Sequence, residues 1–309
     1  MTFTRRTAIA ALAVASSVVA IGDARADWRE QVPTFRIGIL GGQLEALRLR
    51  DHACLKTATE RALGVPVELF ASRDYSGVNE GLRAGTLDAA GLGAAGYAEL
   101  FVEDPDLLEP LAAVQQEDGL LGYYSVLFVR ADSPYRTLDD LRGRSLAFTE
   151  RLSASGFLIP YHELAEQGYR PPSFFRRFGF SGSHPQAVTA VLNGDFDAGV
   201  TWSTVTGDYE KGFSRGNLRR MVDRGMLDMS DVRIVWKSDL IPEGPYVARK
   251  ALPQEAKDLF RQVLLDLADR DRACFERIVG GEAVDFQPIT RDYYDSIIEI
   301  RQNGISGAS

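Results

Sequence analysis

Histidine and cysteine, the side chains most used to bind transition metals, are scarce in this sequence. There are three histidines and two cysteines among 309 residues, and none of them has the spacing of a zinc site. Low-complexity runs are also missing. The sequence therefore argues against a histidine-based metal centre, and we expect no cofactor.

Signatures of catalysis are equally sparse. There is no Ser-His-Asp or Cys-His signature and no nucleotide-binding loop. The glycine-rich stretch Gly91–Gly96 lacks the strand and ribose-binding acid of a dinucleotide site and indicates close backbone packing instead. Asp74 and His184 could form an acid–base pair, which keeps an enzyme open as an alternative. We predict that the chain is not an enzyme.

Acidic residues exceed basic ones. The 43 Asp and Glu outnumber the 35 Lys and Arg, so the formal net charge is −8. Removal of the first 26 residues, which carry three Arg and one Asp, changes it to −10. This balance argues against nucleic acid and anionic membranes as partners. It does not exclude a small anion, because local dipoles determine such a site.

The N-terminal 26 residues have the layout of a bacterial signal peptide. Arg5 and Arg6 precede an apolar stretch at 8–21, and Ala24–Ala26 forms a small-x-small cleavage site. The segment around the two arginines resembles a twin-arginine signal, so we expect export by that route to the periplasm. No cysteine lies near the cleavage site to carry a lipid. A cytosolic chain with an apolar N-terminal helix is the alternative.

Beyond the signal, strand and helix patterns alternate along the chain, which predicts an α/β fold with a largely parallel, doubly wound sheet. We expect a helix over Leu47–Leu63 and a mostly helical tail over Gln254–Ile300. The expected strands are Phe35–Leu40, Val65–Phe70, Ser125–Val129, Ser145–Phe148, Ala198–Thr201 and Val232–Trp236.

An internal repeat suggests two similar lobes. Each copy has the pattern of a short helix, a glycine that ends it, and an Asp-Ala pair that leads into a strand. The matching positions are Tyr75, Gly85, Asp88 and Ala89 in one copy and His184, Gly194, Asp197 and Ala198 in the other. Ordinary turn chemistry between helix and strand is the alternative explanation.

Three junctions between a loop and a helix are rich in small hydroxyl residues and glycine: Ser72–Gly77, Thr149–Gly156 and Ser181–Pro185. A helix N-terminus presents unpaired N–H groups and the positive end of a dipole, which suit an oxyanion. Ser153-Ala154-Ser155-Gly156 adds two hydroxyl donors. Helix capping alone would also explain serine at these positions.

Together these segments resemble the phosphonate, phosphite and phosphate solute-binding proteins of ABC importers. The resemblance extends over nearly the whole chain after the signal. It is carried by Leu69–Tyr75, Gly122–Leu127, Ser153–Pro160, Ser183–His184, Val235–Ser238 and Ile241–Pro242.

The resemblance implies a type II periplasmic binding fold, in which two α/β lobes are joined by a two-strand hinge and close on a ligand. Lobe one would comprise 27–129 plus 239–309, and lobe two 130–238. The hinge would lie near Val129–Arg130 and Ser238–Asp239. The family's ligand-binding positions match Tyr75, Tyr123, Ser153, Ala154, Ser155 and His184. Ala154 replaces a hydroxyl residue of the family's turn.

Relatives that bind aminoethylphosphonate hold its ammonium group with acidic side chains, and those positions align with Thr204 and Gly244. We therefore expect Thr204 to line the site and the ligand to have no cationic tail. Glu243 could compensate if the alignment shifts by one residue. Trp202 is either an apolar wall of the site or part of the core.

The resemblance also implies a disulfide between Cys54 and Cys274, because the C-terminal helices of this fold pack back on lobe one. We expect a monomer that binds phosphite or a small alkylphosphonate, and phosphate less well, for the permease of an inner-membrane ABC transporter. A protein for another oxyanion, or a receptor that serves a sensor, are the alternatives.

Overall fold

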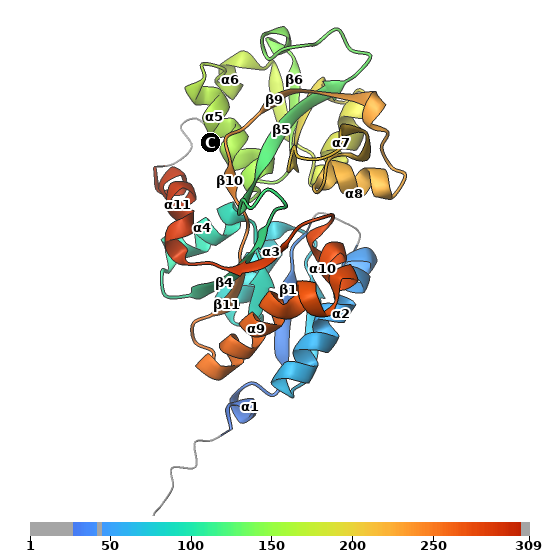
Figure 1. The fold of residues 1–309 in the computed structure, drawn as a ribbon. Coiled ribbons are helices and arrows are strands. Elements are labelled where there is room, and N and C mark those ends of the chain that lie inside the picture. Colours follow the sequence, from blue (N-terminus) through green and yellow to red (C-terminus); the bar gives the residue numbers. More distant parts are fainter. Residues whose placement is uncertain (1–26, 42–44, 304–309) are drawn as a thin grey trace, which may run out of the picture.

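The computed structural model describes residues 27–41 and 45–303, and the predicted signal peptide lies outside them. Two α/β lobes are stacked along the long axis of the molecule (Figure 1). None of the helices in the described part of the chain combines the length and hydropathy that crossing a membrane requires.

Each lobe is built on a mixed sheet. The first sheet has the strand order β12-β4-β11-β3-β1-β2, and the second has β10-β5-β8-β6-β7 with β9 also paired to β5. The strands are β1 (Phe35–Ile39), β2 (Val67–Ala71), β3 (Ala89–Gly91), β4 (Leu108–Gln115), β5 (Gly122–Arg130), β6 (Ser145–Phe148), β7 (Arg177–Phe180), β8 (Ala198–Ser203), β9 (Val232–Lys237), β10 (Ile241–Pro242), β11 (Tyr246–Arg249) and β12 (Asp285–Pro288).

The expectation of largely parallel sheets was wrong. Strands β1, β2 and β3 are parallel to one another, as are β6, β7 and β8, but β4, β5, β9, β10, β11 and β12 all pair antiparallel. Strands β4, β5, β10 and β11 adjoin the two passages of the chain between the lobes. These strands run antiparallel to their neighbours because the chain leaves one sheet for the other and later returns. The alternation of strand and helix patterns in the sequence does not reveal this path.

Helices cover both faces of each sheet. Alternate side chains of β5 show why: Val126 and Phe128 enter one apolar cluster and Leu127 and Val129 the other, all fully buried. The helices are α1 (Trp28–Gln31), α2 (Glu45–Leu63), α3 (Tyr75–Ala84), α4 (Ala94–Glu103), α5 (Ile159–Glu166), α6 (Pro171–Phe174), α7 (His184–Leu192), α8 (Asn217–Asp223), α9 (Gln254–Arg270), α10 (Arg272–Val279) and α11 (Asp295–Gln302).

The internal repeat is confirmed as a structural repeat. Helices α3 and α7 begin at Tyr75 and His184, and each is followed by a glycine with positive φ. The aspartate that comes after each glycine accepts a hydrogen bond from a backbone N–H of the neighbouring strand. Asp88 accepts a hydrogen bond from the backbone N–H of Arg36 in β1, and Asp197 accepts one from Ser145 in β6, both at 2.8 Å. Tyr75 and His184 therefore occupy equivalent helix starts in the two lobes.

The chain passes between the sheets twice, at 116–121 and at 243–245. Two tyrosines of the C-terminal segment form hydrogen bonds with the backbone of these passages. Tyr293 donates its hydroxyl to the carbonyl of Leu121, and Tyr294 donates to the carbonyl of Glu243 at 2.9 Å. Because β5 pairs with strands of the second sheet, the pairing favours lobe boundaries at these passages over 129/130 and 238/239.

The disulfide between Cys54 and Cys274 is present, with a Cα–Cα distance of 6.0 Å. It joins the middle of α2 to α10. The two helices pack with α9 over one face of the first sheet, as the resemblance implied.

Candidate functional site

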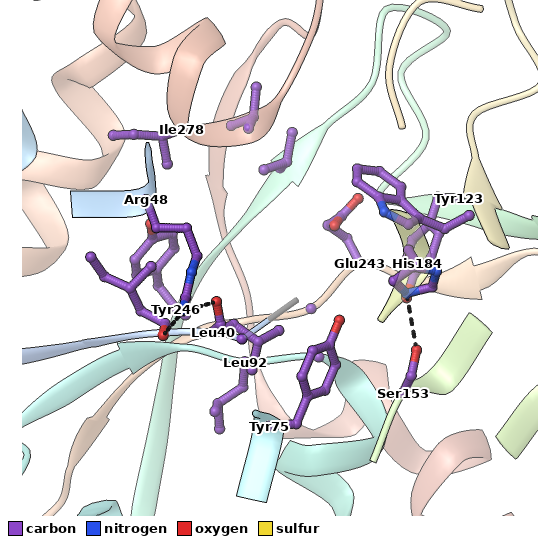
Figure 2. Close-up of a pocket in the computed structure, with 18 of the residues that line it drawn as sticks. Leu40, Arg48, Tyr75, Leu92, Tyr123, Ser153, His184, Glu243, Tyr246 and Ile278 are labelled. Carbon is purple, nitrogen blue, oxygen red and sulfur yellow. Dashed lines mark hydrogen bonds between the residues drawn. The ribbon is translucent and has the colours of Figure 1, made fainter. Parts of the chain in front are cut away.

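A cavity of about 210 Å³ lies between the lobes. Six of the seven predicted ligand residues line it: Tyr75, Tyr123, Ser153, Ala154, Ser155 and His184. Figure 2 shows that Ser153, His184 and Tyr123 gather at one end, with Arg48, Tyr246 and Ile278 at the other and Tyr75 between them. We call the end at Ser153 the cradle and the end at Arg48 the distal end.

The cradle is a helix start with two serines. Ser153 caps a π-helical turn at Ala154–Leu158, and its Oγ accepts a hydrogen bond from the N–H of Gly156 at 2.9 Å. A Cβ at Gly156 would lie 1.7 Å from Thr149 Oγ1, so this turn requires glycine. Ser125 Oγ donates to the carbonyl of Ser155 at 2.7 Å, which holds the turn against β5. The backbone of this turn is thereby rigidly placed for an anion.

Two tyrosines face the cradle from other elements. Tyr75 starts α3 in lobe one, and Tyr123 lies on β5. Burial raises the pKa of both phenols, with further increases from Glu150 near Tyr75 and from Glu243 near Tyr123. The neighbouring hydroxyls of Ser153 and Ser155, respectively, oppose these shifts. Both tyrosines are therefore protonated at neutral pH and can act as hydrogen-bond donors.

His184 is a neutral member of the cradle. Its Nε2 lies 3.2 Å from Ser153 Oγ and its Nδ1 lies 3.2 Å from Thr201 Oγ1. Burial, assisted by the positive charge of Arg220, lowers the pKa of His184 to about 3. The structure places an uncharged imidazole there, so the cradle contributes dipoles rather than formal charge.

Thr204, the seventh predicted ligand residue, does not line the cavity. Its buried hydroxyl lies 2.8 Å from Ser214 Oγ and 3.2 Å from the carbonyl of Arg215. Gly244, the other aligned position, does line it. A Cβ there would lie 2.0 Å from the carbonyl oxygen of Leu92, so a larger residue would displace the passage between the lobes.

Glu243 lines the cavity but is already paired. Arg215 donates to both of its carboxylate oxygens, at 2.7 and 3.2 Å, and Gln116 donates at 3.0 Å. Trp202 is half-buried and is a wall of the cavity: its ring packs edge-on against Tyr123 at 5.6 Å and lies 5.0 Å from the guanidinium of Arg215.

The cavity residues that the sequence did not indicate include four arginines, one of which is Arg277 of α10. Arg48 comes from α2, Arg215 from the loop before α8, and Arg220 from α8. Their positions follow no motif or helical spacing that points to a shared site. Only the closure of the two lobes brings them together.

Several of these side chains bridge the lobes. Arg215 Nε donates to the carbonyl of Val279 at 2.8 Å, and Arg220 donates to that of Ile278 at 3.0 Å. Both carbonyls end α10, where the helix dipole favours positive charge. Arg224 forms an ion pair with Asp51 of α2 at 3.3 Å. In this structure the two lobes are therefore in direct contact with each other beside the cavity.

Asp74 and His184, the acid–base pair considered from the sequence, each bond to other groups. Asp74 caps α3 by accepting from the N–H of Gly77 at 3.0 Å, whereas His184 pairs with Ser153 and Thr201. Within the described residues no group of three or more His, Cys, Asp or Glu side chains could hold a metal ion.

The sequence of residues 48–294 matches the family described as "ABC transporter, phosphonate, periplasmic substrate-binding protein". The chain belongs to this family. Its members are substrate-binding proteins of importers and not enzymes, which confirms the functional class that the sequence predicted.

Individual relatives agree with the family. The chain is 29% identical over 255 residues to the phosphate-import protein PhnD of Mycolicibacterium smegmatis, with 77% of this chain and 75% of the relative covered. It is 30% identical over 225 residues to the phosphonates-binding periplasmic protein of Escherichia coli, with 71% and 62% covered. The structure of PhnD1 from Prochlorococcus marinus in complex with methylphosphonate aligns with a TM-score of 0.74 at 21% identity, covering 88% and 98% of the two chains. That similarity confirms the type II periplasmic binding fold.

Proposed function

We propose that the cavity captures a small phosphorus oxyanion without a cationic tail, namely phosphite or a small alkylphosphonate, and phosphate less well. After export to the periplasm, the chain would deliver this ligand as a monomer to the permease of its ABC transporter. Serine and tyrosine hydroxyls, the N–H groups of a helix start and a neutral imidazole supply the donors that an oxyanion accepts. The methylphosphonate bound by the Prochlorococcus relative is a ligand of this class.

The proposal that the ligand has no cationic tail rests on the hydrogen bonds of Glu243. An ammonium group placed in the cavity loses its water and needs a carboxylate partner. Glu243 is the chain neighbour of the aligned Gly244 and lines the cavity, but it is already bonded to Arg215 and Gln116. The compensation that Glu243 could offer to an amine would therefore require breaking a buried ion pair. An uncharged or anionic substituent faces no such cost.

Calorimetry on the chain without its signal peptide tests this proposal. The panel is phosphite, methylphosphonate, phosphate, aminoethylphosphonate and sulfate. We expect phosphite or methylphosphonate to bind most tightly, and a ligand at a hundredfold over its Kd to stabilise the fold by about 2.7 kcal/mol. Tighter binding of aminoethylphosphonate than of both would contradict the proposal. Tighter binding of sulfate would favour the alternative of another oxyanion.

A role in transport and a role as the receptor of a sensor differ in the protein that the ligand-bound chain activates. We expect the ligand-bound chain to stimulate ATP hydrolysis by its cognate permease complex in proteoliposomes. Stimulation of a sensor kinase without any effect on the permease complex would favour the receptor role.

A further inference from the structure

The distal end of the cavity is larger than a small phosphorus oxyanion needs. Methylphosphonate has five non-hydrogen atoms, which fill about 150 Å³ even if each takes the roughly 30 Å³ of a liquid water. The cavity has about 210 Å³. Space therefore continues beyond the cradle, past Tyr75, toward Arg48, Tyr246 and Ile278 (Figure 2).

Positive charge is concentrated at the distal end. Arg48 lies there, and Arg220 reaches this end through its bond to the carbonyl of Ile278, while the Trp202 ring, 5.6 Å from its guanidinium, lies toward the cradle. Arg277 of α10 also lines the cavity. Asp51 is the acidic residue that lines this end, and it is committed to Arg50 at 3.1 Å and to Arg224 at 3.3 Å. His52 adds no charge, because burial lowers its pKa to about 4.

Arg220 is the decisive residue. Its guanidinium donates to the carbonyl of Ile278 and lies 5.6 Å from the centre of the Trp202 ring. It forms no ion pair with a carboxylate among the residues that the structure describes. Burial and the charges of Arg215 and Arg224 lower its pKa to about 10, against a smaller opposing effect of Asp51, so it is charged at neutral pH. A desolvated cation without an anionic partner is costly, and an anion that enters the cavity would remove that cost.

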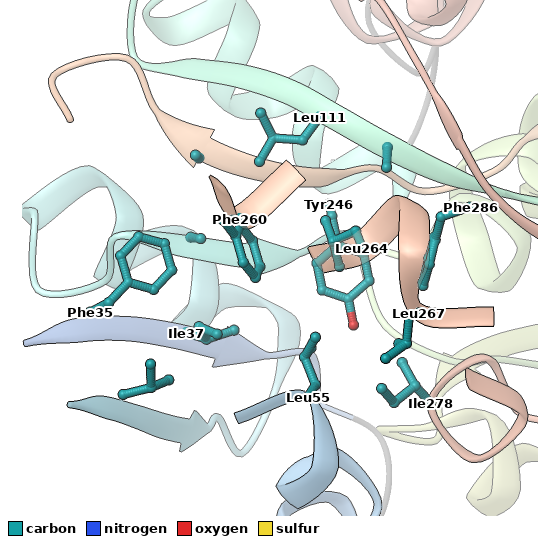
Figure 3. Close-up of a cluster of buried hydrophobic side chains, with 14 of the residues drawn as sticks. Phe35, Ile37, Leu55, Leu111, Tyr246, Phe260, Leu264, Leu267, Ile278 and Phe286 are labelled. Carbon is teal, nitrogen blue, oxygen red and sulfur yellow. The ribbon is translucent and has the colours of Figure 1, made fainter. Parts of the chain in front are cut away.

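Tyr246 adds a donor of a different kind. Its ring is buried in the apolar core of lobe one, and Figure 3 shows its hydroxyl directed toward the side of Leu55 and Ile278. Burial raises the pKa of this phenol, so the hydroxyl keeps its proton. It has no hydrogen-bond partner among the described residues, and it lines the cavity.

We propose that Arg220 and Tyr246, with Arg48 nearby, form a second anion subsite for an acidic group on the substituent of a phosphonate. The substrate class is then an alkylphosphonate that carries a carboxylate on a short carbon linker. The apolar side chains of Ile278 and Phe286 line the same end and suit such a linker. This inference rests on the proposed function, which places the phosphonate group in the cradle.

A matched pair of ligands tests the subsite by calorimetry. Phosphonoacetate and phosphonoacetamide have nearly the same shape, but only the first carries a carboxylate charge in addition to the charge of its phosphonate group. We expect the wild-type chain to bind phosphonoacetate at least tenfold more tightly than the amide. Equal dissociation constants would overturn the inference while leaving the proposed function intact. Failure of phosphite, methylphosphonate and both members of the pair to bind would overturn the proposed function instead.

Variants separate the subsite from lobe closure. Arg220→Gln keeps a donor for the carbonyl of Ile278 but loses the charge, so the tenfold preference for the acid should fall to about one. Tyr246→Phe should reduce the preference severalfold without disturbing the core. Arg219→Gln, on the same helix and paired with Asp223, should leave it unchanged. Equal weakening of both ligands by Arg220→Gln would assign Arg220 to the phosphonate group or to closure, and would overturn the inference.

Discussion

At the scale of residues, the cradle is made of groups whose neutral state is enforced by burial. Two tyrosines with raised pKa, a histidine whose pKa lies at about 3, and two serines all present dipoles without formal charge. Such a site keeps the same hydrogen-bonding pattern across the neutral range of pH. Discrimination between ligands then depends on the charged side chains elsewhere in the cavity lining, which include Arg220, Arg215 and Glu243.

The hydroxyl of Ser155 should be among the groups that hold the oxyanion. Ser155→Ala removes a donor to a charged ligand, so we expect methylphosphonate binding to weaken by about 1.5–3 kcal/mol, a factor of roughly 10 to 150. The Ser155 carbonyl and its bond to Ser125 are kept, so unfolding should change little. Calorimetry and thermal unfolding together check this. An unchanged Kd would remove Ser155 from the set of ligand residues.

Glu150 should make the stability of the chain depend on pH. Its carboxylate accepts from the backbone N–H of Tyr75 across the cleft at 3.0 Å, and its other oxygen is buried without a partner. Burial, aided by Asp74, raises the pKa of Glu150 from 4.5 to about 7. Because the folded pKa lies above the unfolded one, the contribution of this group to stability is present below pH 4.5 and is lost as the pH rises through 7.

Replacing Glu150 by glutamine should abolish that loss. We expect Glu150→Gln to be more stable than the wild type by about 2 kcal/mol at pH 8 and nearly equal to it at pH 4.5, in urea unfolding at each pH. Glu80→Gln, at an exposed position of α3, is the control and should show no such difference. A constant effect of Glu150→Gln at both pH values would contradict the assignment.

At the scale of elements, helix α10 links the disulfide to the closure of the lobes. Cys274 ties the helix to α2, and its C-terminal carbonyls receive Arg215 and Arg220 from the other lobe. The helix ends at Gly280, which has φ of 80°. A Cβ there would lie 1.7 Å from Arg220 Nε, so the close approach of the two lobes requires glycine.

Gly280→Ala should therefore impair closure as well as strain the backbone. We expect it to weaken methylphosphonate binding at least tenfold, because the displaced Arg220 no longer bonds to the carbonyl of Ile278 and the two lobes cannot close fully on the ligand. Gly225→Ala is a matched control, since Gly225 also has a positive φ, of 65°, and a Cβ there meets nothing within 4 Å. Both variants should lose about 1 kcal/mol of stability, but only Gly280→Ala should lose affinity. Equal affinities in calorimetry would show that the contact does not matter for binding.

At the scale of the whole molecule, closure is expected to depend on the ligand. The lobes are joined by two passages and by arginine contacts that place positive charge beside the cavity. Without an anion this charge opposes closure, and with one it favours closure. The hinge near Val129–Arg130 and Ser238–Asp239 stays a prediction, and the strand pairing favours 116–121 and 243–245 instead.

Small-angle scattering should detect this closure. We expect the radius of gyration to decrease when methylphosphonate is added, toward the roughly 19 Å of a compact chain of this size. Gly280→Ala should show a smaller decrease at saturating ligand. A wild-type radius that is the same with and without ligand would argue against ligand-driven closure.

Local signals were sufficient for much of this protein. Strand β6 was predicted to the residue because its apolar run is bounded by turns and is too short for a helix. Helices do begin within the three predicted junctions, with Asp74, Ser153 and Ser183 as their caps, because such side chains accept from the N–H groups of a first turn. The repeat of Asp88 and Asp197 reflects the same turn in both lobes. The disulfide between Cys54 and Cys274 was predicted from the family resemblance that these motifs carry.

The tertiary structure alone decided which charges meet. The partner of Glu243 is Arg215, and Thr204 bonds to Ser214 instead of facing the cavity, because pairing in a closed cleft depends on how two separate lobes approach. Antiparallel strands at the passages likewise result from the path between the sheets. The electrostatic character of the site is thus a property of the packed lobes, since Coulomb interactions between residues distant in sequence depend on their separation in space.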